Sequence, residues 1–175
     1  MSKTKAKVEL EKKEPVADVV TPTLNFLREL SPSLRKSDLK AMKLFNIDDP
    51  AKALEDAYKR NEVLFVGTID GHPVCAVSVI PKPANPYGTN EGSIWLVAND
   101  EFKAFPFTVA KKSKEIFDKL LLSFPIVDTV IDRSDETAKK YALFLGFEDW
   151  GEHYGTTIGE AKMGYFRREY SKGAV

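Results

Sequence analysis

Hydrophobic residues return along this chain with two different periods, which predict an alternation of helices and strands. The clearest helical pattern covers residues 107–124, where apolar positions recur every three or four residues, as one buried face of a helix requires. Asp49 and Pro50 are typical of a helix start, because the carboxylate caps free N–H groups and proline fits the first turn. The remaining helical patterns cover residues 23–30, 34–45, 50–60 and the stretch between Ser134 and Gly146.

Runs of β-branched and aromatic residues predict the strands. Val63–Ile69 and Pro73–Ile80 flank Asp70-Gly71, the dipeptide that a tight hairpin turn with positive φ needs. Further strands are expected at residues 17–20, 93–98, 127–132, 147–150 and 163–170. Residues 81–92 are rich in Pro, Gly and Asn and predict a loop, and Gly151–Lys162 is expected to be a loop or a wide hairpin connection.

This order of elements predicts a mixed α/β sheet with helices packed on it. The chain has 175 residues, which favours a single domain, expected here to span residues 17–175. Residues 1–16 predict a disordered, charged tail, since the first 15 residues carry five lysines and three glutamates without a hydrophobic pattern. The alternative for this tail is a docking arm for a partner or a nucleic acid.

Composition removes several classes of function. The 26 Lys and Arg balance the 26 Asp and Glu, which argues against a protein that coats nucleic acid or binds a membrane through basic residues. No stretch is apolar for the roughly 18 residues of a membrane span, and the N-terminus lacks the apolar region of a signal peptide. One cysteine excludes a disulfide framework and suits a reducing compartment, and with two histidines no metal site is expected. Cys75 lies in an apolar run, which predicts a buried, inert thiol.

The segment Ser93–Phe147 contains a strand, a long helix, a second strand and a short helix that ends in Leu145-Gly146-Phe147. This order and this ending resemble the GNAT N-acetyltransferase family, whose closing motif has an Asn, an Ala and a Tyr before Leu-Gly-Phe. Ser134 and Asp135 stand near the place of the Asn, and Ala138 fits the Ala. The resemblance covers most of residues 17–170 and implies a GNAT-like α/β fold, with a mixed, mostly antiparallel sheet and helices on both faces.

The same segment is similar to GNAT-like proteins of short-tailed bacteriophages, which include small internal virion proteins and acyltransferase-like proteins. Leu34-Arg35 and Asp38 match their N-terminal pattern, whereas Ala41 stands where they have Glu. Three functions follow from this likeness: acyl-CoA-dependent acetyl transfer to an unknown amine acceptor, a non-catalytic role in the virion or its assembly, and binding of a host protein as an effector. The likeness also implies that the protein acts in the host cytoplasm or is packaged in the virion.

The family resemblance implies acetyl-CoA as the cofactor. GNAT enzymes hold its pantetheine along a strand edge, here Ser93–Ala98, so Trp95, Leu96 and Val97 are the candidate residues, with Trp95 and Val97 expected to supply main-chain hydrogen bonds. Lys103, Lys111 and Lys112 are candidate partners of the phosphates, and Ser134 is a further cofactor candidate. The alternative for the three lysines is a solvated helix face.

The residues that would carry the chemistry depart from the family pattern. Between Asn99 and Thr108 there is no glycine, although the family places a glycine-containing turn around the pyrophosphate there. The position of the family's acidic tyrosine is Ala142, so Tyr141, its neighbour, is the candidate acid, with a packed core aromatic as the alternative. Asp132, Glu91 and Asp100 are the candidates for a general base.

Overall fold

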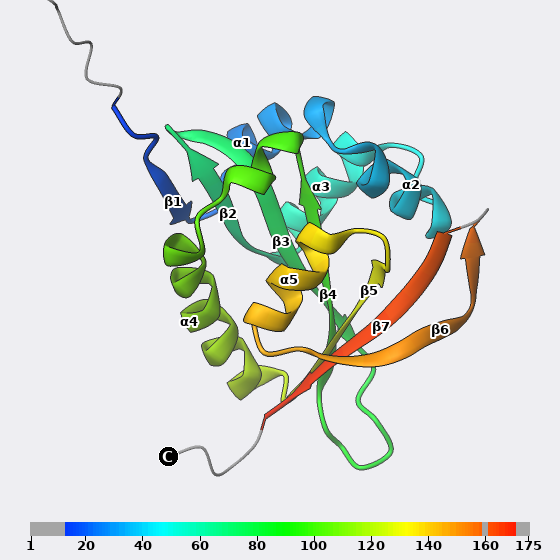
Figure 1. Cartoon of the computed structure of the whole chain (residues 1–175). Helices are drawn as coiled ribbons and strands as arrows, with labels where there is room; N and C mark the ends of the chain where they lie inside the picture. The colour runs from blue at the N-terminus through cyan, green and yellow to red at the C-terminus, as the bar shows by residue number, and fades with distance from the viewer. Residues whose placement is uncertain (1–12, 159–160, 171–175) are drawn as a thin grey trace, which may run out of the picture.

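The computed structural model describes residues 13–158 and 161–170, and the first twelve residues of the expected tail lie outside them. One sheet of seven strands runs through the protein in the order β1-β2-β3-β4-β5-β7-β6 (Figure 1). Every neighbouring pair is antiparallel except β4 and β5, which are parallel. The strands are β1 (Ala17–Val20), β2 (Val63–Ile69), β3 (His72–Lys82), β4 (Glu91–Ala98), β5 (Ile126–Asp132), β6 (Glu148–Ile158) and β7 (Ala161–Glu169).

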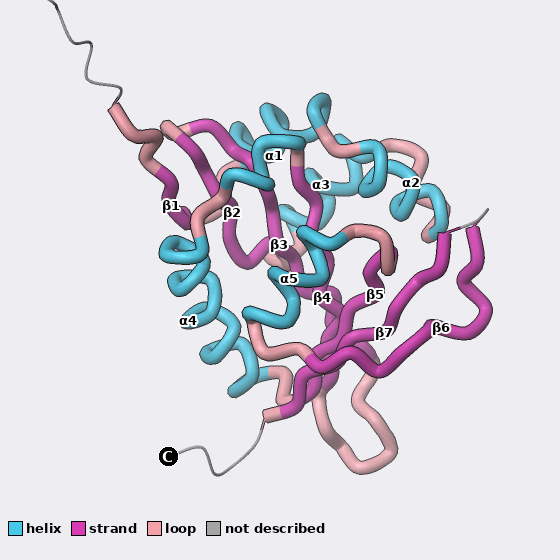
Figure 2. Tube along the Cα trace, in the orientation of Figure 1, coloured by secondary structure: helices cyan, strands magenta, loops and turns pink. Residues whose placement is uncertain are grey.

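Helices cover both faces of this sheet, as Figures 1 and 2 show. One face packs against the hydrophobic cluster of the first three helices, around Leu27, Met42 and Leu54, and the other against α4 and α5, around Phe117 and Leu145. The predicted mixed, mostly antiparallel α/β sheet with helices on both faces is therefore confirmed. The helices are α1 (Leu24–Leu30), α2 (Lys36–Leu44), α3 (Pro50–Lys59), α4 (Phe107–Ser123) and α5 (Glu136–Phe144), with short 3-10 helices η1 (Ser31–Ser33) and η2 (Asp100–Ala104).

The parallel pair β4–β5 is joined over a short length only. Glu91–Ser93 pair with Ile126–Asp128, and beyond them the two strands separate. Strand β4 continues along β3 as far as Ala98, whereas β5 continues along β7 as far as Asp132. Because each strand keeps its outer partner, their second halves diverge and leave a fork whose apex is the register pair Ser93 and Asp128.

Local signals in the sequence are confirmed at three places. Asp70 and Gly71 have φ of 51° and 80°, as a tight hairpin turn between β2 and β3 requires. Gly146 has φ of 90° after the end of α5, the left-handed conformation that glycine adopts without strain. Cys75 is fully buried in β3, where burial raises the pKa of its thiol to about 12, so the thiol is inert as predicted.

The last hairpin is longer than the sequence pattern predicts. The expected loop or wide connection Gly151–Lys162 is mostly strand, because β6 runs to Ile158 and β7 begins at Ala161. Register shifts between Asp149 and Glu152 and between Glu152 and Thr157 interrupt the pairing of β6 with β7. These irregularities break the alternation of residues by which a strand is recognised in a sequence.

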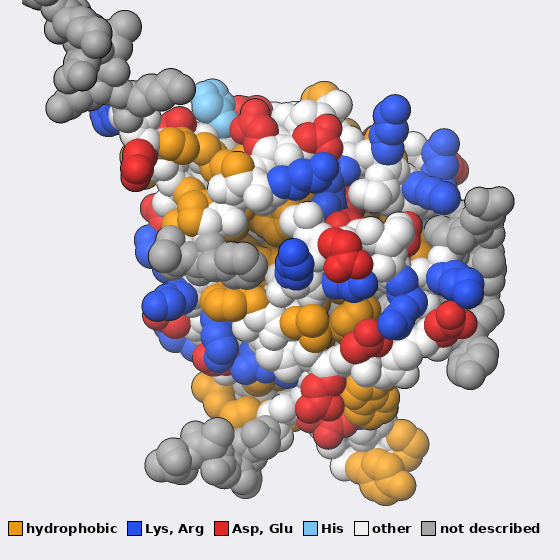
Figure 3. Space-filling view, viewed as in Figure 1, with side chains coloured by type: hydrophobic (Ala, Val, Ile, Leu, Met, Phe, Trp, Pro, Cys, Tyr) orange, Lys and Arg blue, Asp and Glu red, His pale blue; other side chains and the backbone are white. Residues whose placement is uncertain are grey.

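The surface agrees with the balanced composition. Figure 3 shows basic and acidic side chains interspersed over the face in view, without a field of one sign. Within the described part of the chain, no helix is long and apolar enough to cross a membrane.

Candidate functional site

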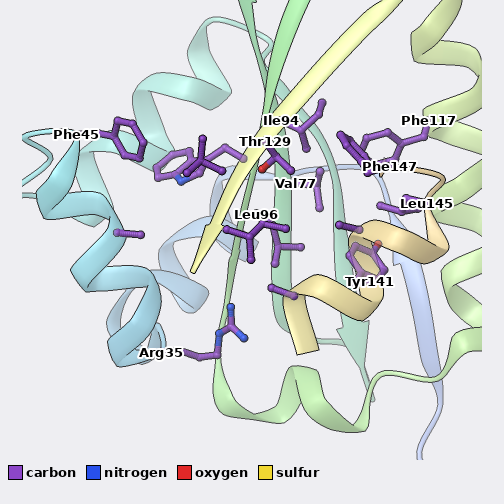
Figure 4. Close-up of a pocket in the computed structure, with 16 residues that line it drawn as sticks. Arg35, Phe45, Val77, Ile94, Leu96, Phe117, Thr129, Tyr141, Leu145 and Phe147 are labelled. Carbon is purple, nitrogen blue, oxygen red and sulfur yellow. The ribbon is translucent and has the colours of Figure 1, made fainter. Parts of the chain in front are cut away.

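A cavity of about 80 Å³ lies between the diverging halves of β4 and β5. Trp95 and Leu96 form its wall on β4, and Thr129 belongs to its wall on β5. Phe45, from the loop that ends α2, and Tyr141 from α5 approach it from opposite faces of the sheet (Figure 4). The fork in the sheet therefore brings residues of both helical layers to one cavity.

The main-chain groups of Ala98, at the end of β4, are already hydrogen-bonded on the side of the strand that faces this cavity. The N–H of Ala98 donates to Oδ2 of Asp38 at 2.8 Å, and the carbonyl of Ala98 accepts the N–H of Arg35 at 2.9 Å. Both partners stand at the start of α2, so the chain's own α2 region occupies the cavity-facing edge of β4 at its last residue.

Strand alternation decides which other main-chain groups of β4 face the cavity. The N–H of Asn99 bonds to Val74 of β3 at 2.9 Å, on the opposite side from the groups of Ala98. Alternate residues of a strand direct their main-chain groups to the same side. Those of Trp95 and Val97 therefore face β3, which corrects the expectation that these two residues present them to a pantetheine. Leu96 presents its N–H and C=O to the cavity instead.

An ion cluster closes the cavity where the strands are farthest apart. Arg35, only 6% exposed, lines the cavity and donates to both carboxylate oxygens of Asp38 at 3.0 and 2.8 Å. The guanidinium also lies 3.1 Å from Asp135, the N-cap residue of α5, and 5.9 Å from the ring centre of Phe102. Burial disfavours the charged guanidinium, but the hydrogen bonds and charge of Asp38 outweigh burial and raise the pKa of Arg35.

A second polar cluster lies at the apex of the fork. Asp128 is 4% exposed and accepts hydrogen bonds from Ser93 Oγ at 2.7 Å, from the Tyr165 hydroxyl at 2.9 Å and from the ammonium of Lys82. Its neighbour Val127 packs in the cluster of α4 and α5, so strand alternation turns Asp128 to the opposite face, toward the layer of α1–α3. The apex thus holds a buried carboxylate with three donors.

Aromatic and basic side chains flank this carboxylate on β6 and β7. The rings of Trp150 and Tyr165 lie 6.0 Å apart, and the guanidinium of Arg167 lies 4.9 Å from the ring centre of Trp150. Trp150 is 53% exposed, so this group reaches from Asp128 to solvent. The cation–π contact between Arg167 and Trp150 holds this aromatic ring in place beside the carboxylate.

A larger cavity, of about 210 Å³, lies where η2, α4 and α5 meet. Two exposed lysines, Lys103 and Lys140, and the aromatic rings of Phe102 and Tyr141 line it. Helix α4 begins beside this cavity without a side-chain cap and without an acidic residue in its first turn. The two ammonium groups and the free N–H groups of a helix start favour an anion here.

The residues predicted from the sequence divide into two groups. Trp95 and Leu96 line the smaller cavity, Lys103 lines the larger one and Tyr141 lines both. The predicted residues that line neither cavity are Val97, which packs in the cluster of α1–α3, and Glu91, Asp100, Lys111, Lys112, Asp132 and Ser134.

Local contacts account for the positions of four of these residues, Lys111, Lys112, Asp132 and Ser134. Lys112 forms an ion pair with Asp18 of β1, and Lys111 is exposed on the same helix. Asp132 accepts hydrogen bonds from the N–H and the hydroxyl of Ser134, at 2.9 and 2.7 Å, in the turn between β5 and α5. Lys112, Asp132 and Ser134 are therefore bonded within the scaffold, whereas Lys111 is exposed to solvent.

The hydroxyl of Tyr141, the candidate acid, has a partner in the core. It donates to Ser113 Oγ of α4 at 2.8 Å, and the tyrosine is 8% exposed. Burial raises the pKa of this phenol above its ordinary value, which makes it a weaker acid.

The sequence analysis did not single out Asp128, Lys82 or Lys140. Asp128 had a signal that could have found it, because it is a charged residue inside the apolar strand IVDTVID. Lys140 had none, since only the packing of η2 against α5 brings it to one cavity with Lys103.

Several of the solved structures that are similar to this one are acetyltransferases. They include an acetyltransferase of the GNAT family from Bacillus cereus (9% identity, covering 90% of this chain and 99% of that chain, TM-score 0.58) and the ribosomal-protein-S5-alanine acetyltransferase from Vibrio fischeri (13% identity, 87% and 92%, TM-score 0.60). A proposed acetyltransferase from Salmonella typhimurium, solved with its cofactor acetyl-CoA, shares 8% identity over 91% of this chain and 96% of that chain, with a TM-score of 0.57.

The protein therefore has the fold of GNAT acetyltransferases, as the resemblance in the sequence predicted. No family model matches the sequence, and no curated protein is significantly similar to it. At such low identities the likeness concerns the fold alone, and the expected bacteriophage origin stays a prediction. Among residues 13–158 and 161–170, no group of three His, Cys, Asp or Glu side chains could hold a metal ion.

Proposed function

We propose that the protein is an N-acetyltransferase that transfers the acetyl group of acetyl-CoA to an amine. The observation that carries this proposal is the fork between β4 and β5, which holds a buried carboxylate at its apex, together with the anion-favouring cavity where η2, α4 and α5 meet. Acetyl-CoA and the amine would approach the gap between the two strands from opposite faces of the sheet. The likeness to a structure solved with acetyl-CoA supports this choice of cofactor.

On one face, this chain's residues fit the parts of a CoA ester. The N–H and C=O of Leu96 would pair with the amides of the pantetheine, because they face the cavity between the strands. Lys103 and Lys140 would neutralise the phosphates at the start of α4, replacing the missing glycine turn with side-chain charge. When bound, acetyl-CoA supplies a thioester carbonyl that an amine attacks.

On the other face, Asp128 is the residue that would receive the amine. A carboxylate held at the apex can accept a hydrogen bond from an ammonium group and take one of its protons. The neutral amine that remains could then form the new C–N bond, with CoA departing as the thiolate. Ser93 and Tyr165 keep two donors on its oxygens, which fixes the carboxylate in one orientation. Asp128 is thus our candidate base, in place of Asp132, Glu91 and Asp100.

One contact favours a different function. Arg35 and Asp38 bond both main-chain groups of Ala98, the next residue of β4 that would pair with a pantetheine. If α2 keeps this position, the fold would serve protein contacts instead of catalysis, as in a virion protein or a host-directed effector.

Binding of acetyl-CoA separates the two functions. A CoA site predicts that millimolar acetyl-CoA raises the melting temperature through mass action. The charge reversal K140E should abolish this rise, whereas K111E, a matched reversal on α4 outside both cavities, should keep it. Absence of any rise with the wild-type protein would overturn the enzymatic proposal.

A further inference from the structure

The ammonium of Lys82 occupies the position that the proposed acceptor amine needs. Lys82 is the last residue of β3, and its side chain is 35% exposed, whereas that of Asp128 is 6% exposed. The lysine arm therefore reaches from the surface to the carboxylate at the apex of the fork. In the sheet Lys82 stands opposite Glu91, yet its ammonium pairs with Asp128.

We propose that Lys82 is a built-in stand-in for the substrate, and that the acceptor is a primary ammonium group at the end of an unbranched alkyl chain. This inference rests on the proposed function for its role in catalysis, although the ammonium site itself does not. Lys82 presents a primary ammonium on four methylene groups. Because this side chain reaches Asp128, an alkylammonium ligand of the same shape should reach it as well.

The surroundings of Asp128 narrow the choice of ligand further. Its other two donors are the hydroxyl groups of Ser93 and Tyr165, so within the described part of the chain Lys82 is the one cation that contacts Asp128. A primary ammonium offers three N–H donors, and a quaternary ammonium offers none. The site should therefore take a primary alkylammonium and reject a quaternary one, although both carry the same charge.

Exchange of the two amines follows from the exposure of Lys82. Asp128 is too buried to be left without a cation, because an unpaired buried charge is strongly unfavourable. The half-exposed lysine arm can move into water and be solvated there, while the ammonium of the acceptor takes its place on Asp128. Lys82 thus keeps the site neutral between substrates and competes with the acceptor amine.

Chemical rescue of a truncated variant tests this directly and without acetyl-CoA. K82A removes three methylene groups and the ammonium, which together have the size of n-propylammonium. We expect K82A to melt at a lower temperature than the wild type, and n-propylammonium chloride well above its Kd to restore about 2–4 °C. Tetramethylammonium chloride at the same concentration should restore nothing, and the wild-type protein should gain nothing from either salt.

Two variants serve as matched controls. K139A removes another lysine in an ion pair, but its partner Glu136 is 66% exposed, so no rescue by n-propylammonium is expected. K82A/D128N keeps the space and removes the charge, and it should also show no rescue. If K82A does not fold, the yield of refolding with and without n-propylammonium replaces the melting temperature.

Equal effects of n-propylammonium and tetramethylammonium on K82A, or equal rescue of K82A and K139A, would overturn the proposed ammonium site. This result leaves the proposed function standing, because acetyl-CoA binding is measured separately on the wild-type protein. Conversely, rescue of K82A without any binding of acetyl-CoA would keep the ammonium site and remove the acetyltransferase.

Discussion

Arg35 and Asp135 form an ion pair of 3.1 Å that joins the start of α2 to the N-cap of α5 across the end of the cavity. Asp38 holds the same guanidinium through two hydrogen bonds and also accepts the N–H of Ala98. Two carboxylates thus share one buried cation, but they have unequal roles. Asp38 connects α2 to the sheet, whereas Asp135 connects it to α5.

This difference predicts unequal effects of two conservative substitutions. D38N removes the main partner of a buried cation and should lower the free energy of unfolding by about 3 kcal/mol. D135N keeps an N-cap side chain and leaves Arg35 its bidentate partner, so about 1 kcal/mol is expected. Urea unfolding of both variants measures the two values. Equal values would show that Asp38 and Asp135 contribute equally to stabilising the charge of Arg35.

Tyr141 offers a test of the acid role against a structural one. Y141F removes a hydroxyl that donates to Ser113 at 2.8 Å inside the core, so stability should fall by about 1 kcal/mol. Because this hydroxyl is bonded elsewhere and its pKa is raised by burial, we expect acetyl transfer to stay within about threefold of the wild type. A fall of kcat by two orders of magnitude, with KM unchanged, would instead establish Tyr141 as the acid.

The elements that could be predicted from the sequence are those fixed by near neighbours in the chain. The turn at Asp70 and Gly71, the periodicity of α4 and the end of α5 at Gly146 all depend on residues a few positions apart. The family resemblance extended this local information to the fold. None of these signals describes how two strands distant in sequence diverge.

The site could not be predicted in the same way, because its environment arises from distant pairings. Asp128 is a potential base only because β5 follows β7 while β4 follows β3. Lys112, placed at the phosphates by its position on α4, lies instead near β1 and pairs with Asp18, which is 94 residues away in the chain. Charge alone could not distinguish Lys112 from Lys140, which does line a cavity.

Gly67 of β2 and Cys75 of β3 predict a coupling between two core substitutions. A Cβ on Gly67 would lie 2.6 Å from the Cys75 sulfur, so G67A should destabilise the protein by about 1–3 kcal/mol. C75A removes that sulfur, and G67A should therefore cost less in the C75A background. Denaturant unfolding of the four proteins of this cycle gives the coupling energy. The Cβ would also lie 3.1 Å from the ring of Phe105, so C75A should recover only part of the stability that G67A loses.

His72 and Glu29 predict a dependence of stability on pH. His72, at the start of β3, lies 2.7 Å from the carboxylate of Glu29 in α1, and this hydrogen bond and charge raise the pKa of the imidazole above 6.5. The contribution to stability is fully present below pH 6.5 and is lost as the pH rises through the raised pKa. Unfolding measured between pH 5.5 and about 8.5 should show this decline. The decline should be absent in E29Q, and its persistence there would assign it to another group.

Asp128 provides the sharpest test of the proposed chemistry. D128N keeps a side chain of the same size that still accepts the hydroxyl of Ser93, but it cannot take a proton from an amine. We expect kcat for acetyl transfer to fall by about two to four orders of magnitude, since a positioned base contributes that much. Binding of acetyl-CoA should be unchanged, because the cofactor is expected on the opposite face of the sheet. The matched control is D132N, which alters a carboxylate of the same strand that bonds Ser134 and lines neither cavity. Comparable losses of kcat in D128N and D132N would place the base elsewhere. A proton acceptor at the fork requires a loss of kcat in D128N alone. Part of that activity should return at high pH, where the free amine is abundant.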